Sequence, residues 1–136
     1  MPDYDPAVRT RTLARIVGPY LIAVAAMLLA RHDRLATLLT AYMQDDLLVL
    51  VTGAFTLMAG LAIVAAHHHW TGPSAIVISL IGVIATLKSA WLMIAPSFGS
   101  EMTGLVVRSP SLLLTIAGIE FLVGCWLSFV GWRRAP

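Results

Sequence analysis

The sequence contains few charged residues. Aspartate, glutamate, lysine and arginine make up 12% of the 136 residues, against about 25% in a typical soluble domain. Hydrophobic residues make up 59%, and the mean hydropathy is +0.87. So few polar side chains cannot cover the surface of a soluble globule, and composition excludes that class. We therefore predict an integral membrane protein in which residues 1–136 form one domain in the lipid bilayer.

Other absences narrow the possible functions. The single cysteine, Cys125, cannot form an internal disulfide. A formal net charge of +2 is too small to indicate a nucleic-acid partner, and the sequence has no Gly-rich phosphate-binding loop. It also lacks a recognisable arrangement of nucleophile and base. We therefore predict a protein that is not an enzyme and binds no cofactor.

The sequence does have four long apolar runs, at residues 13–30, 47–66, 74–95 and 111–132. The last three reach the roughly 20 residues that a helix needs to cross about 30 Å of hydrocarbon. They lack the alternation of strands, and only helices or closed barrels satisfy the backbone in lipid. We predict an all-α fold of four transmembrane helices in a bundle of two α-hairpins. Asp5 and Pro6 suit the start of the first helix.

The segments between the runs give two further predictions. Between the first two runs, RHDRLATLLTAYMQDD places apolar residues at helical spacing on one face, namely Leu35, Leu38, Leu39, Tyr42 and Met43. This pattern predicts a short amphipathic helix in the membrane interface, with an ordinary loop as the alternative. Residues 97–109 contain glycine and serine, and we expect a loop there.

The positive charges indicate an orientation, because cytoplasmic segments carry an excess of lysine and arginine. With four spans, both termini and the loop at 67–72 share one side, which has more of these arginines than the other. They are Arg9, Arg11, Arg15, Arg133 and Arg134, against Arg31, Arg34 and Arg108. The distribution predicts that both termini are cytoplasmic.

Three histidines and a tryptophan follow the second run: His67, His68, His69 and Trp70. Successive side chains on a helix are about 100° apart, so three adjacent histidines cannot converge on one metal ion. Tryptophan is enriched at membrane–water interfaces. We predict a boundary segment with solvated histidines on the cytoplasmic side and no metal. The alternatives are pH sensing and a two-ligand metal site completed by an aspartate of the N-terminal tail.

The same region resembles a family of small bacterial inner-membrane proteins of four helices. The family pattern is Gly-Leu-x-Ile-Val-x-x-His-x-x-Trp, then Ile-Gly, a buried Lys and a closing Pro. It matches at Gly60, Leu61, Ile63, Val64, His67, Trp70, Ile81, Gly82, Lys88 and Pro96. The chain departs from the pattern at His68, Val83 and Ser89, where Asn, Trp and Gly are expected. The resemblance covers about a third of the chain and implies a location in the bacterial inner membrane, but no chemistry.

Small residues form stripes on two predicted helices. Thr52, Thr56 and Gly60 lie at i, i+4 and i+8 of one helix, and Gly82, Thr86 and Ala90 do so on the next. Helices in lipid associate through such close-packing residues. Each stripe therefore indicates a contact either within the chain or with a second copy or another membrane subunit.

The second and fourth runs also resemble each other. Three residues of one, Leu47, Gly53 and Leu57, match Leu112, Gly118 and Leu122 of the other in spacing. The match indicates two similar hairpins in parallel, although chance similarity between apolar segments explains it equally well.

Lys88 and Glu120 are charges deep inside the apolar runs. A charge at the centre of a membrane helix costs at least about 2.5 kcal/mol, so such residues need a partner, water or a route to the interface. Consecutive antiparallel helices would place both at one depth, and we expect them to pair. Three roles are possible for these charges. They could form a structural ion pair that fixes the register of the helices, Lys88 could snorkel to the interface, or Glu120 could carry protons or ions along a path.

These observations lead to two hypotheses for function. The first is a non-enzymatic membrane protein that acts by association, as a homo-oligomer or as an accessory subunit of a larger membrane complex. The second is a proton or cation channel or transporter that uses Lys88 and Glu120.

Overall fold

The computed structural model describes residues 6–67 and 70–133. Within them the regular elements are helices, namely α1 (Pro6–Ala30), the 3-10 turn η1 (His32–Arg34), α2 (Leu35–Gln44), α3 (Asp46–Ala66), α4 (Pro73–Ile94), α5 (Pro96–Val107) and α6 (Pro110–Trp132). Four of these, α1, α3, α4 and α6, are long and apolar enough to cross a membrane. The predicted all-α membrane protein with four spanning helices is therefore confirmed.

The helix boundaries follow from local chemistry. Pro73, Pro96 and Pro110 each begin a helix, where the missing N–H of proline costs nothing and its fixed φ suits the first turn. Asp45 caps α3 by accepting a hydrogen bond from the backbone N–H of Leu48 at 2.9 Å. Gly72 precedes α4 with a φ of +96°, a conformation that favours glycine. Single residues thus form the sharp corners between α2 and α3 and between α4 and α5.

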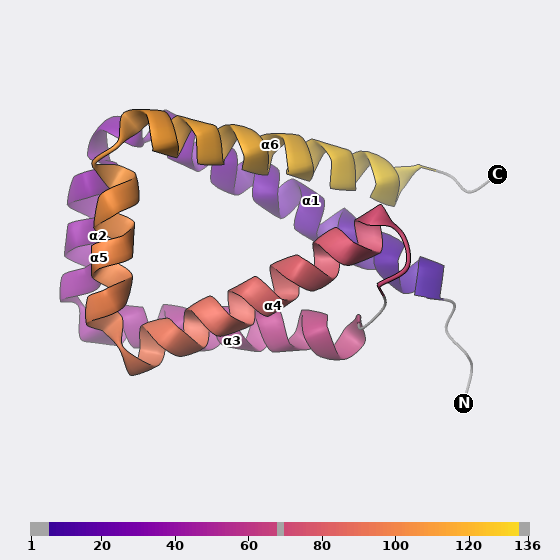
Figure 1. Cartoon of the computed structure of the whole chain (residues 1–136), viewed down its shortest axis with the longest axis horizontal. Coiled ribbons are helices and arrows are strands. Elements are labelled where there is room, and N and C mark those ends of the chain that lie inside the picture. Colours follow the sequence, from indigo (N-terminus) through magenta and orange to yellow (C-terminus); the bar gives the residue numbers. More distant parts are fainter. Residues whose placement is uncertain (1–5, 68–69, 134–136) are drawn as a thin grey trace.

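The short segments between the long helices are helices themselves. The helix predicted after the first span is present as α2, whereas the loop expected at 97–109 is wrong, because helix α5 covers most of it. Pro96 starts α5, two residues after Ile94 ends α4, the third of the long helices. Figure 1 shows α2 and α5 side by side across one end of the molecule, where they pack against each other.

The long helices form two pairs that differ from the predicted hairpins. α3 packs on α4, the helix that follows it, but α1 packs on α6 from the other end of the chain (Figure 1). The prediction of two consecutive hairpins is therefore wrong. Helices α2 and α5, of 10 and 12 residues, span roughly 15–18 Å at 1.5 Å per residue. That length exceeds the 8–10 Å between packed helix axes, so each short helix holds the two long helices that it joins apart.

The chain consists of two similar halves, α1–α2–α3 and α4–α5–α6. Packing of α1 on α6 corresponds to packing of α4 on α3, and in each half the long helices contact the other half far more than each other. Both α1 and α4 run from the end where the chain begins, here called the terminal end, towards α2 and α5 (Figure 1). The halves are therefore related by an approximate two-fold axis along the long helices, as in membrane proteins with parallel repeats.

The glycine contacts fix the register of this repeat. A Cβ on Gly60 would lie 3.1 Å from the Gly82 carbonyl oxygen, and a Cβ on Gly124 would lie 2.9 Å from the Gly18 carbonyl oxygen. Positions 18 and 60 thus correspond to positions 82 and 124, a shift of 64 residues. We call residues related by this shift two-fold counterparts.

The predicted repeat is one residue out of this register. It matched Gly53 with Gly118, but Gly53 packs against Met93, whereas a Cβ on Gly118 would meet no atom within 4 Å. The counterpart of Gly53 is Ala117, and both are buried. The register between the two halves is set by which face of each helix is packed. A match of residue types alone does not determine it.

The hydrophobic core lies where the two pairs meet near the terminal end. Its buried residues are Ala14, Val17, Ile78 and Leu127, and partly buried side chains pack around them, including Leu13, Leu21, Ile63, Val77, Ile81 and Val123. Many are two-fold counterparts, such as Val17 and Ile81 or Ile63 and Leu127. Only 17–22% of each span is buried inside the chain, so most of each long helix is available to lipid or to partners.

Candidate functional site

His67 is buried, contrary to the prediction of a solvated cluster. Its side chain is 1% exposed and lies at the C-cap of α3. Hydrogen bonds join its Nε2 to the Thr10 hydroxyl at 2.8 Å and its Nδ1 to the Ser79 hydroxyl at 3.0 Å. The imidazole is buried because both ring nitrogens find partners, one on α1 and one on α4. Trp70 is 55% exposed, and His68 and His69 lie outside the described residues.

Each helix pair also has a hydrogen bond from a side chain to a backbone carbonyl near the terminal end, one in the α3–α4 pair and one in the α1–α6 pair. The Ser79 hydroxyl donates to the His67 carbonyl oxygen at 3.4 Å, and the Arg15 Nε–H donates to the Gly131 carbonyl oxygen at 2.7 Å. Ser79 and His67 are the two-fold counterparts of Arg15 and Gly131. Both pairs are therefore closed at the terminal end by a side chain that bonds the last turn of its neighbour. In the part of the chain that the structure describes, no three potential metal ligands come together here or elsewhere.

The small-residue stripes contribute mainly to packing within the chain. Gly60 lies against Gly82 and Thr86, and Gly82 lies against Ile63 and Val64. The alternative of contacts within the chain therefore holds for these glycines. Thr52 and Thr56 of the first stripe are exposed, and Ala90 of the second is half-buried.

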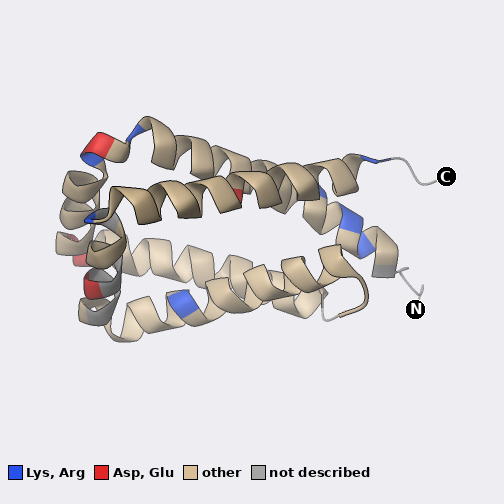
Figure 2. Ribbon diagram, turned by 45° about the horizontal axis from the view of Figure 1, so that its top comes forward, with Lys and Arg blue, Asp and Glu red and all other residues tan. Residues whose placement is uncertain are grey.

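Lys88 and Glu120 do not form the predicted ion pair. No salt bridge joins them, although both are described residues, and Glu120 Oε2 is buried without a hydrogen-bond partner. The expectation failed because α4 packs on α3 and α6 on α1, so these charges lie on different helix pairs. Lys88 is exposed. Figure 2 shows that the long helices carry few charged residues between their ends.

The positions of Lys88, Glu120 and Thr56 follow from the core. Lys88 lies seven residues after the core residue Ile81, and Glu120 lies seven before Leu127. Thr56 likewise precedes Ile63 by seven residues. Seven residues are about two helical turns and return to the same face. Each of these three side chains therefore shares a helix face with a residue packed at the core, and lies nearer to α2 and α5 than the core is.

The chain itself covers this polar group incompletely. Lys88 and Thr56 are exposed, and Glu120 is half-buried. The Thr56 hydroxyl donates to the Thr52 carbonyl oxygen at 2.8 Å, which leaves its oxygen free to accept a hydrogen bond. The sequence identified each of these residues, but not that the fold divides them between the two helix pairs. That placement depends on helix pairings for which the apolar pattern holds no signal.

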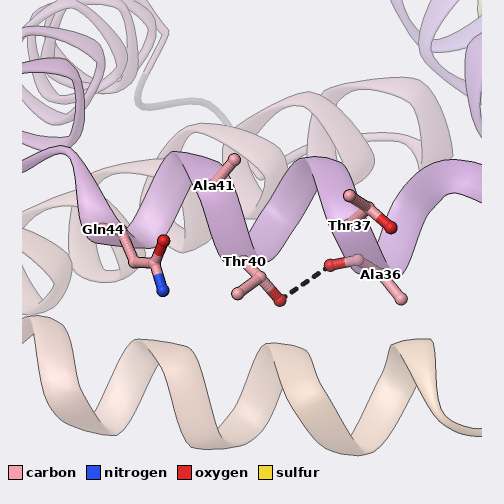
Figure 3. Close-up of a pocket in the computed structure, with 5 residues that line it drawn as sticks. All are labelled: Ala36, Thr37, Thr40, Ala41 and Gln44. Carbon is pink, nitrogen blue, oxygen red and sulfur yellow. Dashed lines mark hydrogen bonds between the residues drawn. The ribbon is translucent and has the colours of Figure 1, made fainter.

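A hollow of about 410 Å³ lies on α2, lined by Ala36, Thr37, Thr40, Ala41 and Gln44 (Figure 3). The Thr40 hydroxyl donates to the Ala36 carbonyl oxygen at 2.8 Å, and none of the lining residues carries a charge. The hollow therefore offers little chemistry compared with the charged group between the helix pairs.

Comparison with family models, curated proteins and solved structures gives no match to this chain. The resemblance to a family of small inner-membrane proteins therefore stays a prediction.

Proposed function

We propose that this protein acts by association within the membrane, as a homo-oligomer or as an accessory subunit of a larger membrane complex. The outer face of α6 supports this proposal. Ser111 and Thr115 are exposed there, and a Cβ on Gly118 would meet no atom within 4 Å. Small residues at this spacing let a neighbouring helix approach closely.

The equivalent face of α3 does not share this feature. The two-fold counterparts of Ser111 and Thr115 are the exposed and bulkier Leu47 and Val51, and only Ala54, the counterpart of Gly118, is small. Because the two helices pack alike inside the chain, their different outer faces point to α6 as the surface that meets a partner.

Copurification of two differently tagged copies from one membrane tests association. Gly118→Leu should lower the recovered partner copy several-fold, because the new side chain blocks close approach. Ala54→Leu, at the matching place on α3, should leave recovery unchanged. Equal recovery from the wild type and both variants would contradict association of copies through α6, and a stable foreign partner lost with Gly118→Leu would favour the subunit form.

A second candidate is a proton or cation channel or transporter. Glu120 favours it, since one of its carboxylate oxygens is buried in a membrane span without a hydrogen-bond partner. Intramembrane carboxylates of this kind often carry protons or ions. Flux into proteoliposomes should then disappear with Glu120→Gln and persist with Glu101→Gln, which alters an exposed residue of α5. Flux that is unchanged by Glu120→Gln excludes this use of the residue.

We further propose that the protein resides in the bacterial inner membrane with both termini in the cytoplasm, because arginines favour that side. In a Cys125→Ser background, a cysteine at Glu101 should react with an impermeant reagent from outside intact cells. A cysteine at Thr71 should react only after the membrane is made permeable. The reverse pattern would show the opposite orientation.

A further inference from the structure

The two helix pairs act as an internal control for each charged residue. Val24 of α1 is the two-fold counterpart of Lys88, and Thr56 of α3 is the counterpart of Glu120. Both pairs cross at counterpart glycines, and Gly60 and Gly124 meet counterpart backbone atoms of the neighbouring helix. Because the α1–α6 pair has no lysine at this position and the α3–α4 pair has no glutamate, packing of a pair requires neither charge. Their presence deep in the spans therefore calls for a role other than packing.

The arrangement of the charges limits what that role can be. The acid lies on the α1–α6 pair and the base on the α3–α4 pair, each two turns from a residue at the core where the pairs meet, yet no salt bridge joins them. A bare cation at Glu120 would be repelled by Lys88, and a bare anion at Lys88 would be repelled by Glu120. A ligand that carries both charges satisfies both side chains at once.

We propose that Lys88, Glu120 and Thr56 form a binding site between the two helix pairs for a group that carries both an ammonium and a phosphate. The Glu120 carboxylate accepts hydrogen bonds from the ammonium, and the Thr56 hydroxyl oxygen accepts another. The Lys88 ammonium donates to the phosphate oxygens. This site goes beyond the proposed function and does not depend on association, which uses the outer face of α6.

This chemistry has two sources, the headgroup of phosphatidylethanolamine and free phosphoethanolamine. The lipid is the source that the surroundings favour. Lys88 and Thr56 are exposed within spans whose neighbouring surface is apolar, including the exposed Leu87 and Phe55 beside them. Acyl chains can lie along such a surface while the headgroup is held between the pairs.

Native mass spectrometry of the full chain tests the site. The protein is released from bilayers that contain phosphatidylethanolamine and phosphatidylglycerol, and the lipid that it retains is counted. The wild type should retain phosphatidylethanolamine in preference. Lys88→Met and Glu120→Gln should each lower that retention about fivefold or more, the effect of losing about one charged contact. Val24→Met, the same side chain at the counterpart position, and Glu101→Gln should retain as much as the wild type.

Equal retention in the wild type and both site variants would overturn the proposal, as would an equal loss with Val24→Met. If a single variant fails to fold, Lys88→Met/Glu120→Gln provides a second test, because a folded double variant that still retains the lipid would also overturn it. Added phosphoethanolamine that displaces the lipid would show that the site accepts the free compound, whereas retention despite it would identify the lipid as the ligand. Gly118→Leu should change copy number but not lipid retention, so a failure of association is distinguished from a failure of this site.

Discussion

The α1–α6 and α3–α4 pairs have the same packing but different chemistry. Each pair is antiparallel, crosses where glycine meets a neighbouring backbone, and is tied at the terminal end by a side chain that donates to a carbonyl oxygen. Yet Lys88 replaces valine, Glu120 replaces threonine, and His67 replaces glycine at counterpart positions. The shared features show what the fold requires. The differences indicate which residues serve another purpose.

The glycine crossings should give the largest effects on stability, and the same effect in both pairs. Gly60→Ala places a methyl group 2.8 Å from the Thr86 backbone nitrogen, and Gly124→Ala places one 3.0 Å from the Ile22 backbone nitrogen. Overpacking of this kind costs about 1–3 kcal/mol. Both variants should therefore unfold at lower temperature in detergent, whereas Gly118→Ala should not, because its methyl group meets open space.

A large loss of stability for only one of the two crossings would break the comparison between the pairs. It would mean that one pair carries the fold and the other is held by lipid or by a partner.

The buried histidine should give an intermediate effect. His67→Ala removes the group that bonds Thr10 of α1 and Ser79 of α4, and the loss of a buried hydrogen-bonded group costs about 1–3 kcal/mol. The unfolding temperature should fall. His32→Ala, which alters an exposed histidine of η1, is the control and should leave it unchanged. An unchanged temperature for His67→Ala would show that α1 and α4 are held together by the apolar core alone.

The sequence predicts the spans well, because apolar length is encoded locally and each run ends within a few residues of a proline, an aspartate or a glycine. It fails on pairing. Apolar helices of similar length do not indicate which neighbour each one contacts, so α1 was expected on α3 rather than on α6. Pro96 was interpreted as an end when it also starts α5.

For the candidate site, too, the sequence predicts the residues but not how the helix pairs place them. Lys88 and Glu120 are evident in the sequence, since charges in apolar runs are rare. Their separation onto different helix pairs is not evident, because it depends on pairings between distant helices. Burial of His67 was missed for a related reason, since its partners Thr10 and Ser79 are distant in the sequence and nothing near His67 points to them.

The smallest expected effect on stability concerns the central claim, that the two charges serve function and not packing. The variant Lys88→Val/Glu120→Thr gives both pairs the same residues at these positions. We expect an unfolding free energy within about 1 kcal/mol of wild type, or higher, because a charge in a membrane span is unfavourable. We also expect that the folded variant no longer retains phosphatidylethanolamine. A variant that is destabilised as much as Gly60→Ala would contradict this account and return Lys88 and Glu120 to a structural role.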